Sequence, residues 1–188
     1  LPIPVAMPPA ARTLKVWDPL VRILHWTLVL SVLAAWFTRH GGGRWHEWLG
    51  YAALACVTLR LVWGFAGPAR ARFAGFVRGP SATLAYAAQV ARRSEPRHLG
   101  HNPLGAWMIL ALLGMAAAAG LSGWLYTTDA YWGEAWLEEL HEQLSHGLLG
   151  LAALHVTGVV FASRRHADNL VAAMIDGRKR PPAPGDLD

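Results

Sequence analysis

Four long apolar runs alternate with polar connectors along the chain, at residues 20–37, 46–65, 104–126 and 140–162. Each run has 18 to 23 residues and at most two charged side chains, and a helix of about 20 apolar residues crosses the hydrocarbon core of a bilayer. The pattern predicts an all-α membrane protein, a four-transmembrane-helix bundle within residues 16–175.

The connectors contain the residues that stop helices. Gly41 to Gly43 end the first run, and Gly67-Pro68 end the second. The basic connector 69–102 includes 80–90, which we predict to be a short amphipathic helix on the membrane surface. Residues 1–15 and 176–188 are predicted to be tails. The Pro-rich segment 1–12 lacks the apolar core of a signal peptide and is expected to be flexible.

Composition supports the membrane assignment. Hydrophobic residues make up 54% of the chain, and the ten Trp gather mainly near the ends of the apolar runs, where aromatic belts meet the membrane interface. Cys56 is the only cysteine, so an intrachain disulfide is excluded, and we expect it to be a packing residue. The sequence also lacks a CxxCH motif, which excludes covalent attachment of a c-type haem.

The distribution of positive charge predicts the orientation in the membrane. Two basic residues fall on one side, Arg39 and Arg44. Fourteen fall on the other: Arg12, Lys15, Arg22, Arg70, Arg72, Arg78, Arg92, Arg93, Arg97, Arg164, Arg165, Arg178, Lys179 and Arg180. The positive-inside rule therefore places both termini in the cytoplasm. Because orientation explains these charges, the net charge of +5 is not attributed to nucleic-acid binding.

Histidines inside the runs are the main candidates for chemistry, because polar residues in a membrane interior are costly. His141 and His155 are fourteen positions apart, so they share one helix face and lie about 21 Å apart along the axis. His25 lies about 8 Å inside the cytoplasmic boundary, and His46 opens the second run at the outer face. Antiparallel helices then pair His25 with His155 near the cytoplasm and His46 with His141 outside.

Two imidazoles on opposite sides of a planar tetrapyrrole form the bis-histidine ligation of a six-coordinate haem b, which favours electron transfer. Zinc and copper sites are disfavoured because the runs lack a full set of further ligands. The expected cofactors are two haems b. For any single histidine, a packed or interfacial residue is the alternative interpretation.

Several segments resemble the bacterial cytochrome b561 family, which includes the b-type cytochrome subunits of nickel–iron hydrogenases. They are VWDPLVRILHW at 16–26, HEWLGY at 46–51, LRLVWGF at 59–65 and LGHNPLG at 99–105, together with His141 and His155. The resemblance implies four transmembrane helices around two haems b in the bacterial inner membrane. It also implies axial ligands at His25, His46, His141 and His155.

Other residues have weaker assignments. Arg60 is predicted to pair with a haem propionate, and the alternative is that it snorkels to the interface. His101 and Asn102 are candidates for a propionate contact or a quinone pocket, although Asn102 before Pro103 is also a typical helix cap. His146 either lines an outer site or faces lipid headgroups or another helix. Three further histidines are expected to be solvated: His40, His98 and His166.

The expected function is electron transfer across the membrane between a periplasmic partner (a dehydrogenase, hydrogenase or c-type cytochrome) and the quinone pool. A self-contained oxidoreductase, such as a superoxide:quinone oxidoreductase, is the first alternative, and a structural anchor for a partner is the second. The outer loop is acidic, which suits either a basic partner or the positive-inside rule alone. Its carboxylates are Asp129, Glu134, Glu138 and Glu139.

Overall fold

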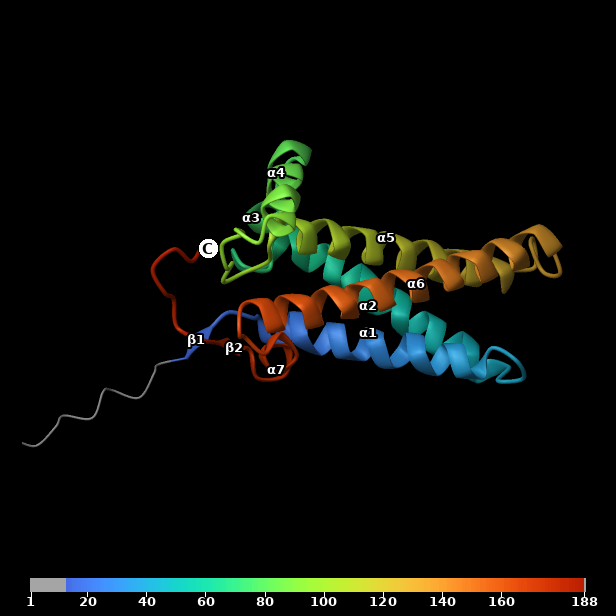
Figure 1. The fold of residues 1–188 in the computed structure, drawn as a ribbon. Helices are drawn as coiled ribbons and strands as arrows, with labels where there is room; N and C mark the ends of the chain where they lie inside the picture. The colour runs from blue at the N-terminus through green and yellow to red at the C-terminus, as the bar shows by residue number, and fades with distance from the viewer. Residues whose placement is uncertain (1–12, 188) are drawn as a thin grey trace, which may run out of the picture.

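The computed structural model describes residues 13–187 as four long helices with short elements at one end (Figure 1). The long helices are α1 (Pro19–Thr38), α2 (Arg44–Ala66), α5 (Pro103–Tyr126) and α6 (Ala135–Arg165). Each is long and apolar enough to cross a membrane. The prediction of a helical chain with four membrane-spanning helices is confirmed. The segment 1–12, predicted to be flexible, lies outside the described residues.

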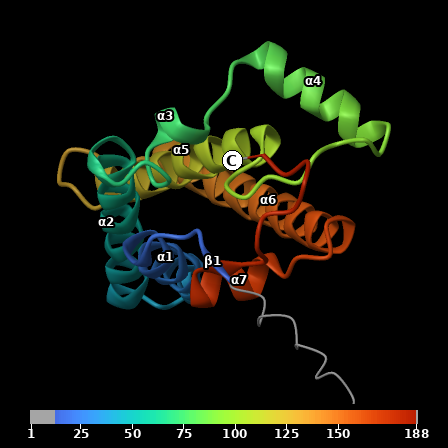
Figure 2. The same ribbon diagram turned by 90° about the vertical axis from the view of Figure 1, so that its left-hand side faces the viewer.

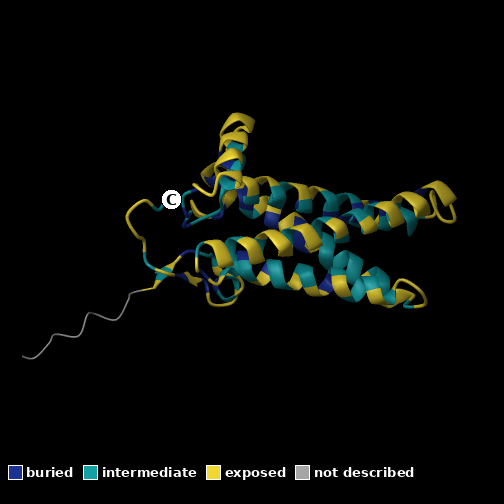
Figure 3. Cartoon of the chain, viewed as in Figure 1, coloured by how far each residue is buried: buried dark blue, intermediate teal, exposed yellow. Residues whose placement is uncertain are grey.

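The bundle is packed unevenly. The closely packed pairs are α1 with α2, α2 with α5, and α5 with α6; α1 and α6 are not among them. The buried apolar cluster belongs to the closely packed side, and its members are Val57, Phe73, Phe76, Ala106, Leu113, Ala116 and Leu148. Most other positions on the long helices are half-buried or exposed (Figure 3), as expected for surfaces that face lipid. The looser side therefore lies between α1 and α6.

Two of the long helices begin with the same local structure, an Asx cap followed by proline. Oδ1 of Asp18 accepts a hydrogen bond from the Val21 amide at 3.1 Å, and Oδ1 of Asn102 accepts one from the Gly105 amide at 2.7 Å. Proline follows each cap, where its missing N–H costs nothing. These caps fix the starts of the first and third spans.

Helix α6 is longer than the predicted span 140–162 at both ends. Its first residues include charged side chains, so a hydropathy pattern does not include them in the span. The negative charge of Glu138 in the first turn nevertheless stabilises the helix, because it interacts favourably with the positive end of the helix dipole. At the other end, the positive charges of Arg164 and Arg165 interact favourably with the negative end of the dipole. Glu138 and Glu139, predicted as loop residues, are thus helical.

The short elements gather at the end of the bundle where both termini of the described chain lie (Figures 1 and 2). Helix α3 (Phe73–Phe76) packs near α2, and α4 (Pro80–Ala91) projects away from the bundle. Strand β1 (Leu14–Lys15) pairs antiparallel with β2 (Arg178–Lys179), which follows α7 (Leu170–Asp176). The C-terminal segment predicted as a tail is therefore paired with the start of the described chain.

Ion pairs hold the C-terminal segment to the connector before α5. Buried Arg97 binds Asp168 at 2.8 Å and Asp186 at 2.6 Å. Nearby, Arg165 binds the Glu95 carboxylate at 2.8 Å. These contacts link the end of α6, the connector and the C-terminal segment into one structured cap on the bundle.

Candidate functional site

His46 and His141 meet near the end of the bundle opposite the termini. Their ring centroids are 6.0 Å apart and the ring planes are nearly perpendicular, at 88°. Nδ1 of His46 donates to the Ala35 carbonyl at 3.0 Å, and Nδ1 of His141 donates to the Ala119 carbonyl at 2.9 Å. Because a carbonyl oxygen only accepts, each Nδ1 carries the proton. Nε2 of each ring is then unprotonated and available to bind a metal.

The spacing of this pair is compatible with one metal between the rings. Two metal–nitrogen bonds of about 2 Å and two ring radii of about 1 Å sum to about 6 Å, close to the observed 6.0 Å. Within residues 13–187, three or more His, Cys, Asp or Glu side chains do not gather into a metal cluster. The candidate ligands at this end are therefore a histidine pair.

Helix α5 places small residues against the His141 ring. A Cβ placed on Gly123 would lie 2.9 Å from Cε1 of His141, closer than real contacts allow. Ser122 is buried beside it, and its Oγ lies 3.1 Å from Nδ1 of His141. The missing side chain of Gly123 therefore permits the close approach of α5 to the His141 ring.

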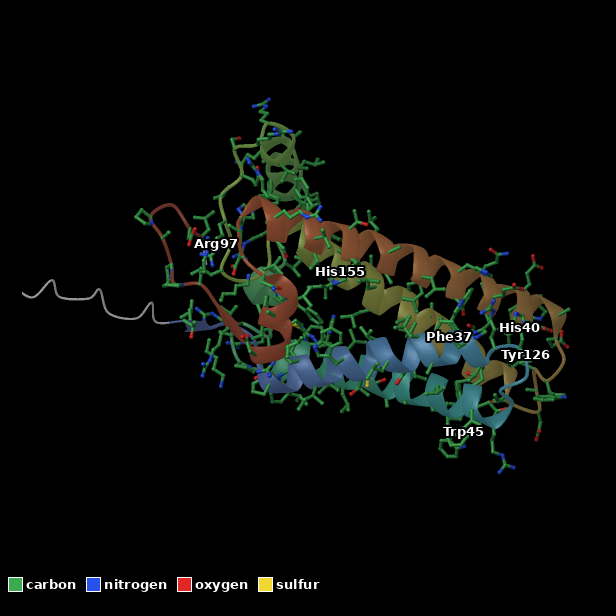
Figure 4. All side chains as sticks on the ribbon, turned by 60° about the horizontal axis from the view of Figure 1, so that its bottom comes forward. Phe37, His40, Trp45, Arg97, Tyr126 and His155 are labelled. Carbon is green, nitrogen blue, oxygen red and sulfur yellow. The ribbon has the colours of Figure 1, made fainter. Side chains whose placement is uncertain are left out.

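His25 on α1 and His155 on α6 form the second predicted pair. Both are half-buried, and they are close enough to interact electrostatically. Nδ1 of His25 is buried without a hydrogen-bond partner among the described residues. Figure 4 shows that His155 lies nearer to the Arg97 end of the bundle than to the Tyr126 end. The structure thus separates the two pairs along the bundle.

Arg60 lies near this second pair, at the same end of the bundle. Its side chain is buried, Nη2 donates to the Ala71 carbonyl at 3.2 Å, and the guanidinium lies 4.9 Å from the Phe73 ring centre. Nη1 is buried and has no partner in the described part of the chain. Arg60 retains one hydrogen-bond donor for an anion.

His101 and Asn102 make different contacts in the structure. The His101 ring lies 4.5 Å from the Trp17 ring and 4.4 Å from the Phe76 ring. Burial, with the charges of Lys179 and Arg60, lowers the pKa of His101 to about 3, so the ring is neutral at pH 7. The Oδ1 atom of Asn102 is occupied by the cap of α5. Of the two, His101 is the one that faces the charged groups near His155.

The remaining predicted residues lie apart from the two pairs. Exposed His146 hydrogen-bonds the Glu142 carbonyl of its own helix at 2.9 Å and packs against Trp36. His98 and His166 are half-buried rather than solvated, because His98 packs against Tyr86 and His166 caps α6. Cys56 is buried and free. The residues found exposed are His40, Asp129, Glu134, Glu138 and Glu139.

Sequence reasoning did not identify two residues as members of the site. Ser122 contacts His141 from another helix, and a small hydroxyl residue in an apolar run gives no signal of that contact. Lys179 was counted only for orientation, yet it is buried near His101. Its sole sequence signal is a basic residue in a tail.

Paired histidines within a bundle of four membrane-spanning helices are compatible with a membrane b-type cytochrome. The family model described as prokaryotic cytochrome b561 matches residues 16–177. The chain therefore belongs to the prokaryotic cytochrome b561 family, a family of multi-pass membrane proteins that bind b-type haem and transfer electrons. Neither the comparison with curated proteins nor that with solved structures gave a match.

Proposed function

We propose that this chain is a di-haem cytochrome that carries electrons across the bacterial inner membrane, between a periplasmic redox partner and the quinone pool. The observation that carries the proposal is the separation of four histidines into two pairs at two depths. His46 and His141 form one pair, and His25 and His155 form the other.

The donor sets fit two bis-histidine haems. In the outer pair, backbone carbonyls fix the tautomer that leaves Nε2 available, an arrangement typical of metal-bound histidine. In the inner pair, the buried Nδ1 of His25 has no partner among the described residues. The two histidines also come from α1 and α6, which are not packed closely together.

When bound, a haem with two histidine ligands supplies one-electron chemistry with no open position on iron. The chain would supply the histidine nitrogens that hold the iron, an apolar interior and charge. Arg60 would hold a propionate carboxylate through its unpaired Nη1. Hydrogen bonds to the carbonyls of Ala35 and Ala119 keep the two outer imidazoles in position.

The depths of the histidines and the distribution of charge support an electron path that runs across the membrane. His141 and His155 are fourteen residues apart on one helix, about 21 Å along its axis, so the two haems would lie toward opposite faces. The positive-inside rule assigns the termini, and with them the inner pair, to the cytoplasm. The exposed carboxylates near Tyr126 would face the periplasm, where they suit a basic partner. Near the inner pair, neutral His101 suits a hydrogen bond to a quinone.

The test uses the full chain in vesicles that contain a quinol in the bilayer and membrane-impermeant ferricyanide outside. The wild-type chain should reduce ferricyanide at the expense of quinol. His46→Ala should abolish this reaction while the remaining haem is still reduced by quinol, and exposed His40→Ala is the matched control. Equal ferricyanide reduction by His46→Ala would contradict the proposal. Rapid haem reduction by superoxide in the isolated wild-type chain would favour a self-contained oxidoreductase.

A further inference from the structure

Lys179 is a buried cation at the cytoplasmic end of the bundle. It lies in β2, opposite Leu14 of β1, and only 5% of it is exposed to solvent. Its neighbour Arg178 is exposed. The strand pairing therefore directs one basic side chain inward and leaves the adjacent one in solvent, which makes Arg178 a natural control for Lys179.

The Lys179 ammonium lacks a carboxylate partner within 4.0 Å in the described part of the chain. Nζ donates to the carbonyls of His98 and Gly100 at 3.4 and 3.5 Å, both long distances for hydrogen bonds. Asp168 interacts with it electrostatically but is bound to Arg97 at 2.8 Å. Because a buried cation without a counter-ion is costly, Lys179 is suited to bind an anion.

The position of Lys179 indicates where that anion would lie. Its ammonium is 5.1 Å from the Trp17 ring centre, and the same Trp17 ring packs against His101. His101 in turn interacts electrostatically with Lys179, Arg60 and His155. Lys179 and Arg60, whose Nη1 has no partner among the described residues, are thus two cationic groups that interact with His101, and His101 also interacts with His155.

We propose that Lys179 is a counter-ion for a carboxylate of the haem held by His25 and His155, and that it raises the reduction potential of this haem. The inference rests on the proposed function, because it needs a haem at the inner pair. In this role Lys179 is a positioning residue: it holds a carboxylate in place and adds positive charge near the iron without binding the iron itself.

The direction of the effect follows from charge. A reduced haem carries one more electron than an oxidised one, so a nearby positive charge favours the reduced state and raises the potential. Burial lowers the pKa of Lys179 to about 8, against the opposing effect of Asp168, so at pH 7 the ammonium is still mostly charged. Removing it should leave the outer haem unaffected, because the outer pair lies at the far end of the bundle.

The experiment is an optical redox titration of the full chain in detergent at pH 7, with Lys179→Gln, Lys179→Met, Lys179→Arg and Arg178→Gln. The inner haem is identified as the component that disappears in His155→Ala. The two uncharged Lys179 variants should titrate at a lower inner-haem potential, with the outer component unchanged. A tenfold change in the reduction equilibrium corresponds to about 59 mV for one electron. Lys179→Arg and Arg178→Gln should titrate like the wild type.

Each other outcome has a defined meaning. A wild-type inner potential in both uncharged variants, or an equal shift in Arg178→Gln, would overturn the role of Lys179 and leave the two haems in place. Loss of the inner haem in the Gln and Met variants, with retention in Lys179→Arg, would support it. A wild-type chain without an inner haem would instead refute the proposed function.

Discussion

The imidazoles of His46 on α2 and His141 on α6 lie edge to face with their ring centroids 6.0 Å apart, and each is oriented by a different neighbouring helix. Ala35, whose carbonyl accepts from His46, belongs to α1, and Ala119, whose carbonyl accepts from His141, belongs to α5. All four long helices therefore contribute to the outer pair. A shift of any one helix would change the geometry of this pair.

Single histidine substitutions should remove one haem each. His46→Ala or His141→Ala should lose the outer haem, and His25→Ala or His155→Ala the inner one, because a bis-histidine haem loses half of its axial ligation. Pyridine-haemochrome quantitation should give one haem per chain in each variant. The combination of His25→Ala with His46→Ala should bind none. If it kept one haem, so that both single variants removed the same haem, the pairing by depth would be wrong.

Gly123→Ala should impair the outer site because the new Cβ would lie 2.9 Å from Cε1 of His141. We expect displacement of the ring, with a haem affinity lower by about 10- to 100-fold, the range found when groups that orient metal ligands are altered. Gly114→Ala on the same helix is the matched control, since its Cβ would meet nothing within 4 Å. Haem retention after detergent dialysis measures both, and equal retention would refute the steric role of Gly123.

Arg97→Ala should destabilise the C-terminal segment strongly. The change leaves Asp168 and Asp186 without their cation, and breaking a buried ion pair from one side costs about 3–5 kcal/mol. Hydrogen exchange should show that residues 178–187 lose protection while the long helices keep theirs. Arg165→Ala, which breaks a partly exposed pair with Glu95, should have a smaller effect. Unchanged protection in Arg97→Ala would show that the segment is held by other contacts.

Acid should release the same segment. A backbone hydrogen bond from Ala183, helped by Arg97, lowers the pKa of Asp186 below its usual value. A carboxylate with a lowered folded-state pKa stabilises the fold above its unfolded pKa of about 4, and this stability is lost as the pH falls through the folded value. Hydrogen exchange of residues 180–187, corrected for intrinsic rates, should rise below about pH 4. Asp186→Asn should already show this behaviour at pH 7, and protection that is constant down to pH 3 would contradict the assignment.

Hydropathy was enough to predict the membrane helices, because a helix that crosses the hydrocarbon core must be long and apolar whichever helices it packs against. It missed the start of α6 at Ala135, where acidic residues continue the helix before the predicted span. Depth counting gave the histidine pairing that the proposal uses, because the rise of a helix is constant. Contacts such as Ser122 with His141, or Lys179 with Trp17, join segments far apart in sequence, and no periodicity within one segment encodes them.

The most direct test of the di-haem account is a reduced-minus-oxidised spectrum with pyridine-haemochrome quantitation on the purified chain. The account predicts two haems b per chain, both low-spin, because each iron would have two histidine ligands. One haem per chain would mean that one histidine pair is structural and the path across the membrane is incomplete. A chain without haem would contradict the account outright.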